Sequence, residues 1–128
     1  MQGSVILPLW RSGDIDSLPG VLAEHVTFSS PVADYHGRAH AAHVLGLIAR
    51  VLEVVEQTGE WDAERETVCA FAARMHGEHL QGMLRERHDE AGRLVHVTLF
   101  LRPYRTLGRA IERMRELLAE SPLPNSST

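Results

Sequence analysis

The chain has 128 residues, of which 44% are hydrophobic and 23% charged, and these values exclude a disordered or fibrous protein. A chain of this length has surface for one core, so we predict a single domain over residues 1–120 and a tail over 121–128. The formal net charge is -4 and Lys and Arg form no stripe, which argues against nucleic acid as a partner.

The sequence also indicates a protein that does not contact a membrane. No apolar run approaches the ~20 residues that span a bilayer, and no basic segment followed by a long apolar core stands at the N-terminus. The single cysteine, Cys69, can form no disulfide within the chain. We therefore expect a cytoplasmic location.

Helices dominate the first half of the predicted structure. Two short helices are expected over residues 4–10 and from about 16 to 25, and a strand over 26–29 ends before Pro31. Apolar residues at helical spacing then predict the longest helix, from about 39 to 57.

Strands dominate the second half. From residue 60 to 102 the hydrophobic period changes to two, which indicates a meander of antiparallel strands. A final helix is predicted from about 105 to 119, with Leu107, Ile111 and Met114 on its apolar stripe. This order of elements indicates an α+β fold.

One turn fixes the register of a hairpin within the meander. His76-Gly77 has the composition of a two-residue turn, so Met75 should lie opposite Glu78. Continued along both strands, this register places Cys69 opposite Leu84.

A second turn over residues 89–92 predicts that His88 lies opposite Arg93, and Leu84 opposite Val97. The two turns agree on one apolar face, which we expect to line a pocket together with Trp10. This face comprises Cys69, Phe71, Ala73, Leu80, Gly82, Leu84, Val95, Val97, Leu99 and Leu101. The opposite face is mixed in character and is interpreted as an oligomer interface.

Several short segments, in this order and spacing, resemble the nuclear transport factor 2-like superfamily. They are Arg11-Ser12-Gly13-Asp14, residues 25–32, Tyr35-His36-Gly37-Arg38, Leu80-Gln81-Gly82, and Gly92-Arg93-Leu94 leading into residues 101–103. The resemblance implies a cone-shaped, curved antiparallel sheet packed against N-terminal helices, with a C-terminal helix. It also implies a homodimer formed through the outer sheet face and a ligand held inside the cone.

The chain departs from the ketosteroid isomerases of this superfamily. Where they have a proton-shuttling aspartate it has Ser30, and their oxyanion-hole aspartate and tyrosine fall at Leu84 and near Ile6. Proton abstraction beside a ketone needs a base and hydrogen-bond donors to the enolate, so isomerase activity of that type is disfavoured. The deep inward face also lacks the carboxylates and arginine that a limonene-type epoxide hydrolase needs.

The resemblance therefore implies a protein that binds a small hydrophobic molecule, with a SnoaL-like cyclase or an isomerase of secondary metabolism as its enzymatic form. Ser30, His36 and Glu86 are the candidate catalytic residues. The alternative is a non-catalytic dimerisation or binding module whose cone is filled by its own side chains.

No cofactor is expected, and no metal. His40 and His43 share one side of the predicted helix, with His36 close in sequence, but no carboxylate or cysteine accompanies them at ligand spacing. Cys69 is expected to point into the cone as a small hydrophobic residue.

Overall fold

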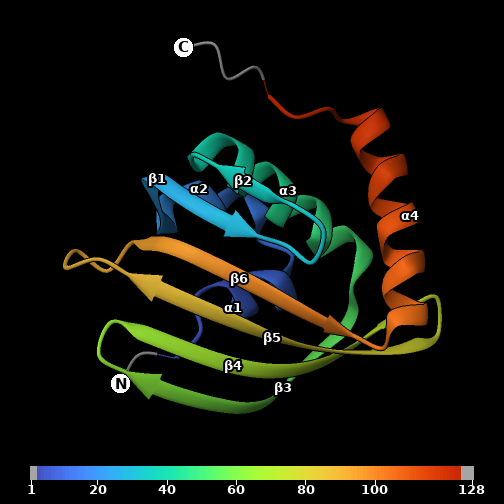
Figure 1. The fold of residues 1–128 in the computed structure, drawn as a ribbon, viewed down its shortest axis with the longest axis horizontal. Helices are drawn as coiled ribbons and strands as arrows, with labels where there is room; N and C mark the ends of the chain where they lie inside the picture. Colours follow the sequence, from blue (N-terminus) through green and yellow to red (C-terminus); the bar gives the residue numbers. More distant parts are fainter. Residues whose placement is uncertain (1–2, 125–128) are drawn as a thin grey trace.

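A computed structural model describes residues 3–124 of the chain (Figure 1). The helices are α1 (Ile6–Ser12), the 3-10 turn η1 (Ile15–Ser17), α2 (Leu18–Val21), α3 (Arg38–Val51) and α4 (Tyr104–Glu120). The strands are β1 (Leu22–Ser29), β2 (Asp34–His36), β3 (Glu53–Ala63), β4 (Glu66–Met75), β5 (Glu78–His88) and β6 (Leu94–Arg102).

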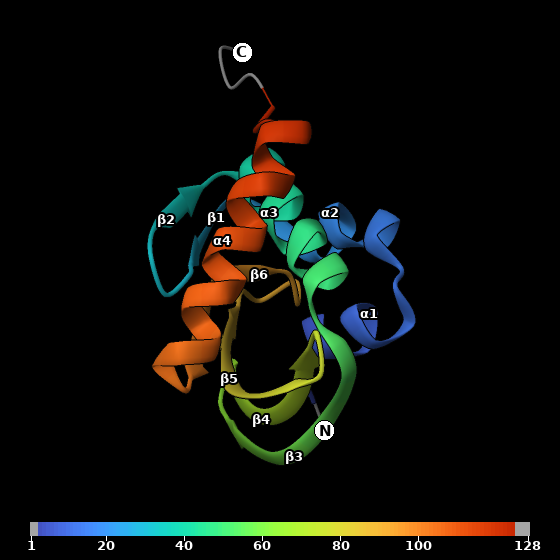
Figure 2. The ribbon, with the colours of Figure 1, turned by 90° about the vertical axis from the view of Figure 1, so that its right-hand side faces the viewer.

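The strands form one six-stranded sheet in the order β2-β1-β6-β5-β4-β3. Figure 2 shows how strongly this sheet curves, with α1 to α3 on its concave side and α4 beside its open end. The predicted α+β class and curved sheet are therefore confirmed. The sheet is mixed rather than wholly antiparallel, because β6 returns alongside β1 in the same direction.

The hairpin between β4 and β5 has the register that the sequence predicts. Both turn residues have positive φ, 50° at His76 and 81° at Gly77, as a two-residue hairpin turn of type I′ requires. Met75 lies opposite Glu78 and Cys69 lies opposite Leu84.

The predicted register of the second hairpin was wrong by two residues, since Leu84 pairs with Leu99 rather than Val97. The turn is one residue longer than predicted, because the N–H of Asp89 donates to the carbonyl of Arg93 at 2.8 Å. A bulge next to His88 adds the second residue. Because the total shift is even, the residues beyond the bulge keep their predicted face.

Two predicted helices are shorter than expected because their ends belong to strands. Helix α3 ends at Val51, and residues 53–57 begin β3, which pairs with β4. Val55 is buried in the core from this strand rather than from a helix. Likewise, β1 starts at Leu22 instead of residue 26, because Leu22 pairs with Leu94 of β6.

The main hydrophobic core fills the concave side of the sheet. Trp10 of α1 packs edge to face against Phe71 of β4, with ring centroids 5.9 Å apart. The Trp10 indole N–H also donates to the carbonyl of Leu45 in α3 at 2.9 Å. Among the described helices, none has the length and apolar character that crossing a membrane requires.

Candidate functional site

An apolar pocket of about 210 Å³ lies at the open end of the curved sheet, between α3, α4, β6 and the β1–β2 loop. Its apolar lining comprises Pro31, Val32, Val44, Ile48, Val51, Leu52, Leu99, Leu101, Leu107, Ala110, Ile111, Met114 and Leu118. A larger hollow of about 660 Å³ beside α3 is a surface depression with charged residues in its lining, so it is the weaker candidate for enclosing a ligand.

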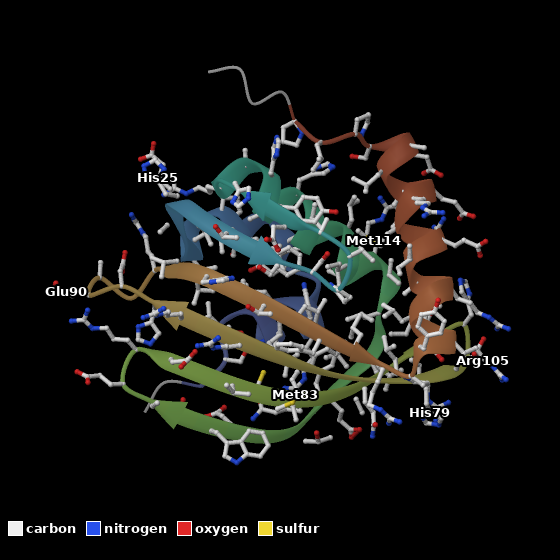
Figure 3. The ribbon with its side chains drawn as sticks, in the orientation of Figure 1. His25, His79, Met83, Glu90, Arg105 and Met114 are labelled. Atoms are coloured by element: carbon white, nitrogen blue, oxygen red, sulfur yellow. The ribbon has the colours of Figure 1, made fainter. Side chains whose placement is uncertain are left out.

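Helix α4 supplies one wall of the pocket through the apolar stripe that the sequence predicts. Figure 3 shows Met114 between α4 and the body of the protein, and Arg105 pointing away from it. A second, smaller hydrophobic cluster joins this helix to α3 and β4; it contains Leu47, Val51, Met75, Ala110 and Leu117. The pocket therefore lies beside the contact that holds α4 in place.

Three polar residues, Ser30, Tyr35 and Arg115, complete the lining. The Ser30 hydroxyl is engaged by its own loop: it donates to the carbonyl of Ala33 at 2.9 Å and accepts from the N–H of Ala33 at 3.1 Å. The Tyr35 ring stacks on Phe28, with centroids 6.1 Å apart. Among these lining residues of the described chain, none carries a carboxylate or an imidazole.

The cone interior is filled by side chains, so most of the predicted pocket-lining residues belong to the core instead. Only Leu99 and Leu101 of that set line the pocket under α4. The core contains Trp10, Cys69, Phe71, Ala73, Leu80, Leu84 and Val97. The physical reason is that α1 and α3 enter the concave side and occupy the space expected for a ligand.

Two other members of the predicted set lie elsewhere. Val95 sits at the bulge in β6 and lines a shallow hollow with Arg87 and His88. Gly82 is buried under Phe71, and a Cβ atom there would come within 2.5 Å of the Phe71 ring.

Glu86 is a buried cap of helix α1. Its side chain accepts hydrogen bonds from the backbone N–H of Val5 at 2.7 Å and of Ile6 at 3.3 Å, and from the Ser4 hydroxyl at 2.5 Å. Burial raises the pKa of this carboxyl group above its ordinary value, and the three hydrogen bonds oppose that effect. These contacts give Glu86 a structural role.

The structure does not bring the three candidate catalytic residues together. Ser30 lines the pocket, Glu86 holds α1, and His36 is exposed on β2, where its ring lies 3.3 Å from the Thr27 hydroxyl. Burial raises the pKa of the Cys69 thiol to about 11, which makes it a poor nucleophile.

His40 and His43 of α3 contact the segment that follows α4. Nε2 of His40 lies 2.8 Å from the Pro124 carbonyl, and Nε2 of His43 lies 2.7 Å from the Ser121 carbonyl. Part of the predicted tail is thus bound to α3, while residues 125–128 lie outside the described chain. Within residues 3–124, no three His, Cys, Asp or Glu side chains gather as metal ligands would.

The sequence did not predict that Tyr35, Arg115 or the apolar residues of α3 and α4 line a pocket. The sequence predicted the apolar stripe on the last helix but not the surface that it packs against, because that surface combines residues of α3, β6 and the β1–β2 loop, which lie far apart in the sequence. Arg115 carries no local signal, since it stands among other charged residues of the same helix.

Searches based on sequence found no match among family models or curated proteins. Solved structures are similar over most of the chain. A steroid delta-isomerase from Pseudomonas aeruginosa has a TM-score of 0.84 and 28% identity, covering 88% of this chain and 85% of its own. The chain is a member of the nuclear transport factor 2-like superfamily.

Two further structures share the fold of this superfamily member. An uncharacterised protein with a cystatin-like fold from Silicibacter pomeroyi DSS-3 has a TM-score of 0.86 and 21% identity, covering 91% of this chain and 84% of its own. The epoxide hydrolase/cyclase-like enzyme SalBIII, which has a role in pyran ring formation in the polyether salinomycin, has a TM-score of 0.65 and 15% identity. It covers 76% of this chain and 84% of its own.

Proposed function

We propose that this superfamily member binds a small hydrophobic molecule in the pocket between α3, α4 and β6. The observation that carries the proposal is the nearly continuous apolar lining of a recess at the open end of a filled cone. Ligand pockets are typically apolar with a few placed polar groups, and Ser30, Tyr35 and Arg115 are those groups here.

The lining favours binding over acid-base catalysis. A general base needs a carboxylate or imidazole within hydrogen-bond reach of its substrate, and the described lining offers neither. A cyclase or isomerase working in this pocket would depend on shape selection and on the three polar residues. The likeness to a steroid delta-isomerase and to SalBIII supports the superfamily.

Thermal unfolding with neutral apolar probes, such as toluene, cyclohexanol and 3-phenylpropanamide, tests the proposal. A probe at a hundred times its dissociation constant adds about 2.7 kcal/mol to stability, which raises the unfolding midpoint by several degrees in a domain of this size. Ile111→Trp should fill the pocket and abolish the shift. Glu112→Trp, at an exposed position of the same helix, is the control and should keep it. If no probe raises the midpoint of the wild type, the proposal fails.

A second candidate function, dimerisation through the outer sheet face, is favoured by one observation. Met83 and Phe100 are opposite each other in β5 and β6 and are 37% and 56% exposed. Met83 also lies opposite Ala70, so an apolar row crosses three strands of this face. A homodimer would bury this row.

Analytical ultracentrifugation tests this second candidate. We expect a dimer for the wild type and a monomer for Phe100→Lys, because a buried unpaired charge opposes association. Val32→Lys, at an exposed site away from the sheet face, should remain dimeric. A wild type that sediments as a monomer at all concentrations would rule out the interface. We also propose a cytoplasmic location, which cell fractionation checks.

A further inference from the structure

The polar side chains that line the pocket differ in how many of their possible hydrogen bonds and ion pairs are formed within the protein. The Ser30 hydroxyl already donates to Ala33 and accepts from the same loop. The guanidinium of Arg115 is always charged, and it can donate hydrogen bonds but cannot accept them. Within residues 3–124, it lies in none of the ion pairs found.

The other arginines in the middle of α4 are paired. Arg109 forms an ion pair with Glu78 of β5, and Arg113 pairs with Glu116 one turn further along the helix at 2.9 Å. Arg115 is therefore the cation that α4 leaves available at the pocket. Tyr35, on the β2 side of the same pocket, adds a hydroxyl that can also donate.

A ligand that complements these groups brings an acceptor with negative charge. Guanidinium groups bind carboxylates through paired hydrogen bonds, and a bond between charged partners is stronger than one between neutral groups. Because the rest of the lining is apolar, the rest of the ligand should be hydrocarbon-like.

The size of the pocket limits that hydrocarbon part. At about 210 Å³ it exceeds the roughly 150 Å³ cavity that holds benzene, but it falls below the roughly 300 Å³ at which pockets for drug-sized ligands begin. A single ring or a short chain fits this space, whereas a fused four-ring steroid exceeds it.

We propose that the pocket selects a one-ring or short-chain carboxylic acid, bound as its carboxylate with the acid group on Arg115 and Tyr35. This inference rests on the proposed function, because it uses the same pocket. Since the whole chain carries a net charge of -4, selection depends on the local cation rather than on long-range attraction.

Isothermal titration with a matched pair of probes tests the inference. 3-Phenylpropanoate and 3-phenylpropanamide have nearly the same size, and only the first is charged. We expect the carboxylate to bind the wild type about fivefold more tightly or better, and expect the difference to shrink as salt is raised.

Variants on α4 separate the roles of charge and shape. Arg115→Gln should lose the preference for the carboxylate, so that the two probes bind this variant with similar affinity. Arg105→Gln makes the same change of charge on another exposed arginine of α4, one that lies outside the lining, and should keep the preference. Circular dichroism checks that both variants are folded.

The outcomes distinguish this inference from the proposed function. If the amide binds and the carboxylate binds no more tightly, the inference is overturned while the pocket keeps its function. A preference for the carboxylate that survives in Arg115→Gln also overturns it. If Ile111→Trp leaves the binding of both probes unchanged, the pocket is not their site, and the proposed function fails together with the inference.

Discussion

The side chain of Glu86 in β5 accepts a hydrogen bond from the backbone N–H of Val5 at 2.7 Å, although the two residues are 81 positions apart in sequence. This contact satisfies a donor at the start of α1 that has no partner within the helix. It also fixes the helix that places Trp10 in the cone. Glu86 is 1% exposed, so its charge is held in the core.

The buried charge of Glu86 should make stability depend on pH. Burial raises the pKa of this group in the folded protein above its ordinary value of 4.5, and Glu60 adds a smaller effect in the same direction. The folded state then binds more protons than the unfolded state between the two pKa values. The contribution of Glu86 to stability is present below pH 4.5 and is lost as pH rises through the folded pKa.

Glu86→Gln isolates this contribution, because it keeps an acceptor oxygen and removes the ionisation. We expect the free energy of unfolding of the wild type, relative to that of the variant, to fall with rising pH across this window. Denaturant unfolding at a series of pH values measures the difference. Glu24→Gln, at an exposed position of β1, is the matched control. A constant difference between wild type and Glu86→Gln would contradict the assignment.

Cys69 should be unreactive in the folded protein. The side chain is fully buried and its pKa is raised to about 11, so little thiolate forms at neutral pH and reagents cannot reach it. Labelling with a thiol reagent such as iodoacetamide, followed by mass spectrometry, should show modification only after denaturant is added. In Ser12→Cys, the exposed new thiol should be labelled in the folded state while Cys69 is not.

Two glycines should respond to alanine in opposite directions. A Cβ at Gly82 would lie 2.5 Å from the ring of Phe71 and 2.8 Å from the carbonyl oxygen of Phe100, so Gly82→Ala should cost about 1–3 kcal/mol. Gly108 lies within α4 with open space around it, and Gly108→Ala should stabilise the fold by about 0.5–1 kcal/mol. Chemical denaturation of both variants checks the signs, and a stable Gly82→Ala would show that the β5 backbone can shift.

The hydrogen bonds from His40 and His43 should protect the end of α4. Replacing both with Ala removes the contacts to the Ser121 and Pro124 carbonyls, each worth about 1 kcal/mol. We expect faster amide hydrogen exchange over the last turn of α4 and little change in the sheet. His25→Ala, at an exposed position of β1, is the matched control. Unchanged exchange in the double variant would show that the hydrophobic contacts of Leu117 hold the helix alone.

The sequence by itself determined the features that depend on near neighbours. The His76-Gly77 turn set the β4–β5 register, because a two-residue loop leaves only one alignment of its flanking strands. The spacing of Leu107, Ile111 and Met114 identified the apolar side of α4, because helical periodicity is a local property. The order of helices and strands along the chain indicated the α+β class, because each of these elements is recognised from its own local pattern.

Tertiary structure alone decided where the pocket lies and what Glu86 does. The bulge beside His88 changed the β5–β6 pairing, and the pairing of residues 53–57 with β4 ended α3 early. Packing of α1 into the cone filled the predicted cavity, so the remaining space lies under α4, next to Arg115. These outcomes depend on contacts between segments far apart in the chain. A local sequence pattern does not show which of several competing packings has the lowest free energy.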